Sequence, residues 1–248
     1  MPTVGDLQPE WQVPPGRMEP LPWEAARFRD MSQNPHLPEA IYRYMIAHNP
    51  PTDPLVDELV TETAAMGAIR SMQVGVEQAA LLGFMVRLVR ARFVVEVGTF
   101  TGLSALAMAR ALPEGGRLLC CDISEEYTSV ARRYWDRAGV TDRIDLRLAP
   151  AVETLQALPR TRSVDLAFVD ADKESYIVYY EELVPRLAPG GILIADNIFM
   201  NGLVVDEEPG QIALDATAFA RHVQADPRTE TVLVPIGDGF SFTRLRDS

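Results

Sequence analysis

Short apolar runs alternate with amphipathic segments from Phe93 onward, and this alternation restricts the possible folds more than any other feature of the chain. Five runs are expected to be strands: residues 93–97, 117–121, 144–148, 164–169 and 192–195. Helical patterns occupy the intervals between them: residues 103–112, 125–138, 151–158 and 174–187. Strands that alternate with helices build a parallel sheet with helices on both faces.

The C-terminal end departs from this alternation. Residues 231–235 and 240–245 follow a helical pattern at 211–224, and they are joined by Ile236-Gly237-Asp238-Gly239. Two runs at that spacing are typical of an antiparallel hairpin. The sequence therefore predicts an α/β fold with a Rossmann-like, doubly wound sheet of seven strands, mostly parallel with a C-terminal antiparallel hairpin.

The sequence before Phe93 divides into two parts. Residues 1–35 are rich in proline, so we expect an irregular N-terminal arm there and one domain over residues 36–248. Amphipathic helical patterns follow the arm at residues 38–48, 53–66 and 76–90. Asp53 is the expected N-cap of the second of these helices, because Pro54 suits the first helical position.

The charge and the apolar pattern disfavour several classes of partner. The chain carries 23 Lys and Arg against 35 Asp and Glu, a formal net charge of −12, so we expect no nucleic-acid partner. No apolar run reaches the ~18 residues of a membrane span, and the N-terminus does not look like a signal peptide. Cys120 and Cys121 fall in an expected buried strand, a pattern typical of a reducing compartment. We expect a cytoplasmic protein without a membrane partner.

A turn with two glycines, Gly98-Thr99-Phe100-Thr101-Gly102, follows the first expected strand. Glycine lets the backbone turn tightly and lets a ligand approach closely. Phe100 stands where a dinucleotide-binding Gly-x-Gly-x-x-Gly turn requires glycine, and no Gly-Lys-Ser/Thr of a phosphate loop follows. The turn predicts either a nucleoside site without phosphates or an ordinary connection between a strand and a helix.

Two acidic residues flank this turn. Asp122 ends the second expected strand, 26 residues after Glu96, and a carboxylate there can accept hydrogen bonds from both ribose hydroxyls. The alternative for Asp122 is an N-cap of the next helix, which Ser124 could fill instead. Glu96 would be costly to bury alone, so we expect a bound amino group beside it. Ser104 can cap the following helix and donate to a ligand carboxylate.

Oxygen-bearing side chains also follow the fourth and fifth expected strands. Asp170, Asp172 and Lys173 come after one strand, and Asp196 and Asn197 come after the other. Because neighbouring strands of such a sheet end close together, Asp170, Asp196 and Asn197 are expected to converge. Ligands of this kind select Mg²⁺, Mn²⁺ or Ca²⁺ over zinc. The alternative is that these residues are solvated acids in loops.

Five segments of the chain form a set when they are taken together. They are Glu96-Val-Gly-Thr-Phe-Thr-Gly-x-Ser104, Cys121-Asp122, Val169-Asp-Ala-Asp-Lys-x-x-Tyr-x-x-Tyr-Tyr-Glu181, Pro189-Gly-Gly191 and Asp196-Asn-x-x-x-Asn-Gly202. This set resembles the cation-dependent O-methyltransferases of the caffeoyl-CoA/catechol O-methyltransferase group, and the match covers about residues 38–245.

The resemblance implies S-adenosylmethionine as methyl donor, a divalent cation (Mg²⁺ first, Mn²⁺ or Ca²⁺ as alternatives) and a homodimer. It implies a methyltransferase domain over residues 36–248, with a metal on Asp170, Asp196 and Asn197. The implied contacts with S-adenosylmethionine are Val74, Glu96, Gly98, Thr99, Ser104, Asp122, Ala151, Asp170 and Asp172. The implied catalytic residues are Lys173, as base, and Asp170. Met72 and Asn201 are implied beside a small aromatic acceptor that is catechol-like, with ortho-dihydroxy groups.

The chain also differs from parts of that group. Met200 stands where plant members have tryptophan, and the N-terminal arm lies outside the match, which disfavours a plant-type CoA ester as acceptor. Two alternatives are a nucleotide-linked dehydrogenase, which shares the sheet, and a non-catalytic or differently specific S-adenosylmethionine-binding protein. The dehydrogenase would be expected to show the third glycine, and the non-catalytic protein would be expected to lack the metal ligands.

Overall fold

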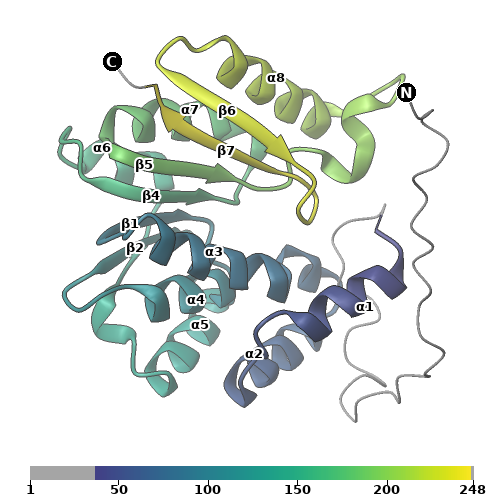
Figure 1. Ribbon diagram of the computed structural model, residues 1–248, viewed down its shortest axis with the longest axis vertical. Coiled ribbons are helices and arrows are strands. Elements are labelled where there is room, and N and C mark those ends of the chain that lie inside the picture. Colours follow the sequence, from purple (N-terminus) through teal and green to yellow (C-terminus); the bar gives the residue numbers. More distant parts are fainter. Residues whose placement is uncertain (1–36, 247–248) are drawn as a thin grey trace, which may run out of the picture. The chain divides into compact units, whose positions relative to one another are not determined.

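A seven-stranded sheet forms the centre of the computed structural model, which describes residues 37–246 (Figure 1). The strands are β1 (Phe93–Val97), β2 (Arg117–Asp122), β3 (Ile144–Leu148), β4 (Val164–Val169), β5 (Leu187–Ala195), β6 (Thr229–Val234) and β7 (Phe240–Leu245). Their order in the sheet is β3-β2-β1-β4-β5-β7-β6. β1 to β5 pair in parallel, whereas β7 pairs antiparallel with both β5 and β6. The predicted sheet, mostly parallel with a C-terminal antiparallel hairpin, is confirmed.

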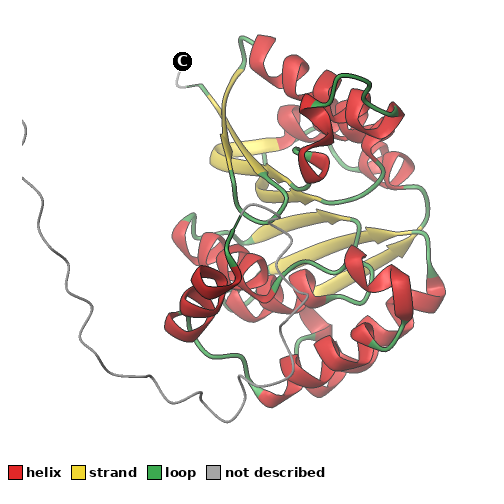
Figure 2. Cartoon of the chain, turned by 90° about the vertical axis from the view of Figure 1, so that its right-hand side faces the viewer, coloured by secondary structure: helices red, strands yellow, loops and turns green. Residues whose placement is uncertain are grey.

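Helices lie on both sides of this sheet (Figure 2). The α-helices are α1 (Glu39–His48), α2 (Pro54–Ala64), α3 (Val76–Leu88), α4 (Leu103–Ala111), α5 (Glu125–Arg137), α6 (Ala151–Ala157), α7 (Tyr176–Leu183) and α8 (Gln211–Ala225). Short 3₁₀ turns are Gly67–Met72, Thr141–Arg143, Lys173–Ser175, Val184–Arg186 and Met200–Val205. Asp53 caps α2 as predicted, because its carboxylate accepts a hydrogen bond of 3.0 Å from Val56 N.

The middle of the sheet is the core of the protein. Val94, Val95 and Leu166 have no exposed surface, as expected for parallel strands covered on both faces. Burial of each such side chain contributes roughly 1.5–3 kcal/mol to the free energy of unfolding. Trp135 of α5 is also buried, and its indole N–H donates to Gly102 O at 3.2 Å. The loop after β1 is therefore held against a rigid helix.

The segment between β4 and β5 differs from the predicted single helix over residues 174–187. It is divided into the 3₁₀ turn Lys173–Ser175, the helix α7 and the 3₁₀ turn Val184–Arg186. Pro185 has no amide hydrogen, so the α-helical hydrogen-bond ladder cannot continue through it. β5 begins at Leu187 rather than Ile192, because Leu187 pairs with Val164 across an irregularity in the β4–β5 register.

Some expectations concern parts of the chain that the structure does not describe. The predicted N-terminal arm over residues 1–35, and with it the start of the predicted domain, lies outside the described residues. Across residues 37–246, no helix has both the length and the apolar character needed to cross a bilayer. Cys120 and Cys121 are buried free thiols in β2, as the apolar run predicted.

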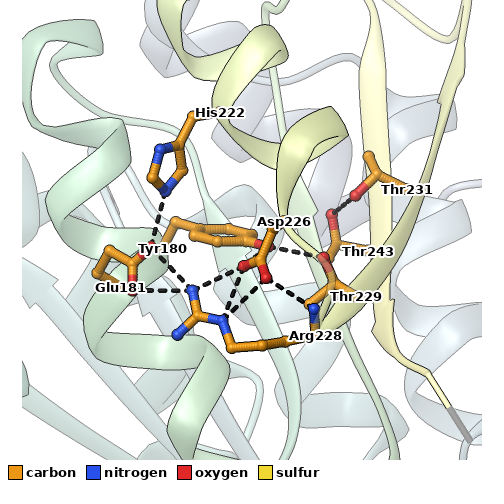
Figure 3. Close-up of polar contacts among 8 residues, drawn as sticks. All are labelled: Tyr180, Glu181, His222, Asp226, Arg228, Thr229, Thr231 and Thr243. Atoms are coloured by element: carbon orange, nitrogen blue, oxygen red, sulfur yellow. Dashed lines mark hydrogen bonds and ion pairs between the residues drawn. The ribbon is translucent and has the colours of Figure 1, made fainter.

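A polar network joins α7, α8 and the start of β6 (Figure 3). Arg228 Nη2 lies 2.6 Å from Asp226 Oδ2 and 2.8 Å from Glu181 Oε1. Tyr180 OH donates to Asp226 Oδ2 at 2.8 Å, and His222 Nε2 lies 2.7 Å from Glu181 Oε1. Hydrogen bonds from Arg228 are the main reason that the pKa of Asp226 is lowered to about 2. The network therefore fixes the end of α8 to α7 and to the sheet.

We expect Asp226→Asn to lower the free energy of unfolding by about 1–2 kcal/mol at pH 7, because a charged acceptor with little exposure is lost. The folded-state pKa of Asp226 lies below the unfolded value of about 3.9, so its contribution is full above that value and is lost as pH falls toward 2. Urea unfolding of parent and variant at pH 7 and pH 3 measures this. An equal difference at the two pH values would contradict the assignment.

Candidate active site

Backbone hydrogen bonds align the carboxyl ends of four strands. Gly98 N donates to Cys121 O at 2.9 Å, and Asp170 N donates to Val97 O at 2.8 Å. Asp196 N donates in turn to Val169 O at 2.9 Å. The first residues after β1, β4 and β5 therefore continue the ladder of the sheet, which places the side chains of Asp170 and Asp196 at one edge.

A cavity of about 790 Å³ opens at this edge, which is a size typical of small-molecule sites. Most of the predicted site residues line it: Met72, Val74, Gly98, Thr99, Ser104, Asp122, Ala151, Asp170, Asp172, Lys173, Asn197 and Asn201. Glu96 and Asp196 are absent from the lining, and both are fully buried beneath it. The structure thus brings the whole predicted set to one place, with two of its acids in a supporting layer.

Gly98 is required by a close approach between two parts of the site. Its φ is +88°, in the left-handed region that favours glycine, and an added Cβ would lie 1.9 Å from Asp170 O. No side chain fits in that space. The turn after β1 therefore rests directly on the backbone of the residue that follows β4.

The carboxylate of Asp122 organises the turn. Its Oδ2 accepts hydrogen bonds from Thr99 N at 2.9 Å and from Phe100 N at 2.8 Å, and its Oδ1 accepts one from Ser124 N at 2.8 Å. Ser124 is the N-cap of α5, since its hydroxyl accepts a hydrogen bond from Tyr127 N, so the helix cap is filled without Asp122. A carboxylate has about four lone-pair positions, which leaves acceptor capacity for ribose hydroxyls.

Glu96 lies under the same turn with no exposed surface. Its carboxylate accepts hydrogen bonds from Thr99 Oγ1 at 3.0 Å and from Ser104 Oγ at 2.7 Å. Burial raises the pKa of Glu96 to about 7, in spite of these hydrogen bonds. The buried acid is therefore satisfied by two hydroxyls of the protein, and a nearby positive charge would favour its ionised form.

Two further carboxylates lie at the ends of β4 and β5. Burial raises the pKa of Asp196 well above its usual range, and the negative charge of Asp170 raises it further. Asp196 Oδ2 accepts a hydrogen bond from Gln78 Nε2 at 2.8 Å, and Oδ1 accepts one from Asn197 N at 2.5 Å. Burial also raises the pKa of Asp170, although Lys173 opposes this effect. Two acids in one low-dielectric place call for positive charge.

Lys173, the only lysine in the chain, is the nearest basic side chain. Its side chain is 6% exposed, and Nζ lies 3.6 Å from Asp170 Oδ1. Nζ donates to Asn197 Oδ1 at 3.3 Å, to Ala171 O at 3.2 Å and to Tyr176 OH. The predicted base and two of the predicted metal ligands are thus within hydrogen-bonding or ion-pair reach of one another.

The two residues predicted for the acceptor, Met72 and Asn201, also line the cavity. Met72 is 53% exposed at the rim, and Asn201 has a φ of +54° within the 3₁₀ turn Met200–Val205. Asn201 N donates to Asp238 Oδ1 at 2.7 Å, so the β6–β7 turn supports the Asn201 backbone. Met200 and Ile212 add apolar surface to the lining. These side chains form a lining that suits a flat, partly apolar molecule.

Sequence patterns assigned no role to several residues of the site. Gln78 contacts Asp196 across 118 residues of sequence, and the helical pattern around it indicated only a buried face. Tyr176 was part of a motif, but its hydroxyl proves to bind both Lys173 and Asp196 O, the latter at 3.1 Å. Asp238 was considered only as part of a hairpin turn. Its position between two glycines was the one available signal.

The predicted metal ligands include an amide oxygen as well as carboxylates. Among residues 37–246, no group of three or more His, Cys, Asp or Glu side chains could hold a metal ion. The predicted set differs in kind, because it joins two carboxylates, Asp170 and Asp196, to the amide oxygen of Asn197. Such a set is compatible with hard cations that retain several waters.

Known proteins resemble this chain over most of its length. A family model described as O-methyltransferase matches residues 47–246. The probable caffeoyl-CoA O-methyltransferase 2 of Dictyostelium discoideum is 34% identical over 209 residues, 82% of this chain and 90% of that protein. The caffeoyl-CoA O-methyltransferase of Eucalyptus gunnii is 32% identical over 217 residues, 83% of this chain and 87% of that protein.

A solved structure agrees with the sequence relatives. The O-methyltransferase from Bacillus cereus, in complex with SAH (S-adenosylhomocysteine), has a TM-score of 0.75 with this fold at 27% identity. The comparison covers 84% of this chain and 97% of that chain. The family match over residues 47–246 includes all seven strands of the sheet.

We expect Gly98→Ala to lower the free energy of unfolding by about 2–5 kcal/mol, because strain at positive φ adds to a clash with Asp170 O. Gly139→Ala is the matched control: Gly139 has a φ of +67° but nothing within 4 Å of an added Cβ, so only the strain of about 1–2 kcal/mol applies. Urea unfolding measures both variants. Equal losses would show that the contact with Asp170 is unimportant.

Proposed function

Because this chain belongs to the O-methyltransferase family and is thereby an S-adenosylmethionine-dependent enzyme, we propose that it methylates a small ortho-dihydroxy aromatic acceptor with the help of a divalent cation. One observation carries the proposal: the carboxylate of Asp170, the amide of Asn197 and the only lysine of the chain line one cavity, and the buried carboxylate of Asp196 follows the neighbouring strand. The family assignment argues against a dehydrogenase and against a non-catalytic binding protein.

The half of the cavity around Gly98 suits the cofactor. S-adenosylmethionine supplies a methyl group on a positively charged sulfur and has no phosphate. Asp122 would accept hydrogen bonds from the ribose, and Glu96 would face the amino group through the layer of Thr99 and Ser104. Acidic groups at both positions repel phosphates, which supports a nucleoside ligand of this kind over a dinucleotide. Val74, Ala151 and Asp172 would complete the wall.

The other half suits a hard cation. Asp170, Asp196 and Asn197 would hold Mg²⁺, or Mn²⁺ or Ca²⁺ in its place, because all three present oxygen ligands. The closeness of the two acids supports this assignment, because the negative charge of Asp170 raises the pKa of Asp196 beyond the effect of burial. A bound cation would supply the charge that lowers the pKa of a phenol from its ordinary value of about 10.

Lys173 would act as the general base for the acceptor hydroxyl. Tyr176 OH and Ala171 O accept hydrogen bonds from Nζ beside Asp170 and Asn197, so a hydroxyl held by the proposed cation would lie within reach of this amine. The phenolate oxygen that results would attack the methyl group in line with the bond to sulfur. Much of the rate enhancement would come from positioning, because one cavity would hold S-adenosylmethionine and the acceptor next to each other.

The aromatic ring of the acceptor would be enclosed by four residues of the lining: Met72, Met200, Asn201 and Ile212. The apolar side chains would exclude water from the ring, while the amide of Asn201 would mark one polar position on it. A homodimer, which the resemblance implies, and a cytoplasmic location are part of the same proposal, and we include no nucleic-acid or membrane partner.

The test is a panel of dihydroxybenzenes with S-adenosylmethionine and Mg²⁺, scored by mass for one added methyl group. We expect ortho isomers to be methylated and meta isomers to serve as the negative control, because only adjacent hydroxyls can share one cation. EDTA should abolish the reaction, and added Mg²⁺ or Mn²⁺ should restore it. Methylation that persists after chelation would refute the metal role but leave the methyltransferase assignment intact.

Two replacements of Lys173 distinguish its proposed role as a general base from the effect of its positive charge. We expect Lys173→Met to lower kcat by about 10²–10⁴-fold, the usual contribution of a general base. Lys173→Arg keeps a positive charge near Asp170 but supplies no base, so it should lose a similar factor. Binding of SAH, measured by calorimetry, controls for folding. Full kcat in Lys173→Arg would show that charge alone suffices.

A further inference from the structure

Gln78, in the first turn of α3, uses both ends of its side-chain amide in the protein interior. Its Oε1 accepts a hydrogen bond from Gly75 N at 2.8 Å, and its Nε2 donates to Asp196 Oδ2 at 2.8 Å. The side chain has no exposed surface. The first bond caps the helix, a common structural role, but the second one reaches a predicted metal ligand in another part of the fold.

The β6–β7 turn packs against the side chain of Gln78 where it contacts Asp196. Gly237 has a φ of +54°, and a Cβ added there would lie 2.4 Å from Gln78 Nε2. Asp238 O and Gly239 O, in the same turn, accept hydrogen bonds from Phe199 N and Ile198 N, at 3.0 and 3.2 Å. The turn therefore covers Gln78 and also holds the segment that follows Asp196.

We propose that Gln78 is a positioning residue that fixes the carboxylate of Asp196 for the divalent cation and links it to the cavity wall. This inference rests on the proposed function, because it assumes a cation at Asp170, Asp196 and Asn197. The link to the wall runs through Gly75, which follows Val74 directly.

Hydrogen bonds to both oxygens determine how the Asp196 carboxylate is turned. Asn197 N donates to Oδ1 and Gln78 Nε2 donates to Oδ2. Rotation of the carboxylate would therefore break one of these bonds at a side chain that has no exposure to solvent. Each oxygen keeps a further lone pair for a cation. Groups that hold a metal ligand from behind commonly change metal affinity 10–100-fold when they are replaced.

The decisive experiment measures Mn²⁺ affinity in the full chain with SAH present, by the electron paramagnetic resonance signal of free Mn²⁺. Gln78→Met keeps the length of the side chain but has neither donor nor strong acceptor, so we expect Mn²⁺ to bind about 10–100-fold more weakly. A circular dichroism spectrum like that of the parent would show that the fold is intact, and saturating SAH in both samples keeps the comparison to the cation alone. Saturating Mn²⁺ should recover most of kcat.

Gln73→Met is the matched control. Gln73 is also largely buried and donates to Thr63 Oγ1 at 2.9 Å and to Thr101 Oγ1 at 3.0 Å, and neither threonine is a predicted metal ligand. We expect Mn²⁺ affinity like that of the parent. An equal loss in both variants would overturn the inference, because it would indicate general loosening of the wall.

The remaining outcomes are distinguishable. If the parent binds Mn²⁺ and Gln78→Met binds it equally well, the inference fails and the proposed function stands. If the parent binds no divalent cation, the metal part of the proposed function fails and the inference fails with it. If Gln78→Met does not fold, Gly237→Ala decides: its added Cβ displaces the Gln78 amide, and unchanged Mn²⁺ affinity there would overturn the inference.

Discussion

The carboxylates of Asp170 and Asp196 follow neighbouring strands because β4 and β5 pair in parallel and end at the same level, and the rest of the site depends on this arrangement. Burial raises the pKa of Asp170 and of Asp196, and the charge of the first raises the pKa of the second further. Their partners are one basic side chain, Lys173, together with neutral donors from Gln78 and the Asn197 backbone. One basic group does not balance two ionised acids, so a bound cation, as proposed, would stabilise their charged forms.

The acids in the half proposed for the cofactor differ from Asp170 and Asp196, because they accept hydrogen bonds from the turn that they support. Asp122 accepts backbone N–H groups from the turn, and Glu96 accepts the hydroxyls of Thr99 and Ser104. These hydrogen bonds hold the turn in one shape, so we expect little ordering of the turn when a ligand binds. The contact of Gly98 with Asp170 O joins the two halves, so neither can shift alone.

The sequence predicted the strands and the side chains at their ends because both depend on local patterns and on one rule about parallel sheets. Asp122, Asp170 and Asp196 were placed in this way. The partnership of Gln78 with Asp196 could not be predicted, because apolar periodicity indicates which face of a helix is buried but not what lies opposite. The division of the 174–187 helix was missed for another reason: Pro185 was a visible signal, but the apolar periodicity continues through it.

The burial of Lys173 has a practical consequence. Every other basic side chain of fixed charge in the chain is an arginine, so reagents that modify primary amines meet one side chain only, apart from the amino group at the start of the polypeptide. That side chain stands inside the cavity with 6% of its surface exposed. Reductive methylation with an isotope label would therefore place one spectroscopic probe in the cavity, and its rate of modification would report on whether the cavity is filled.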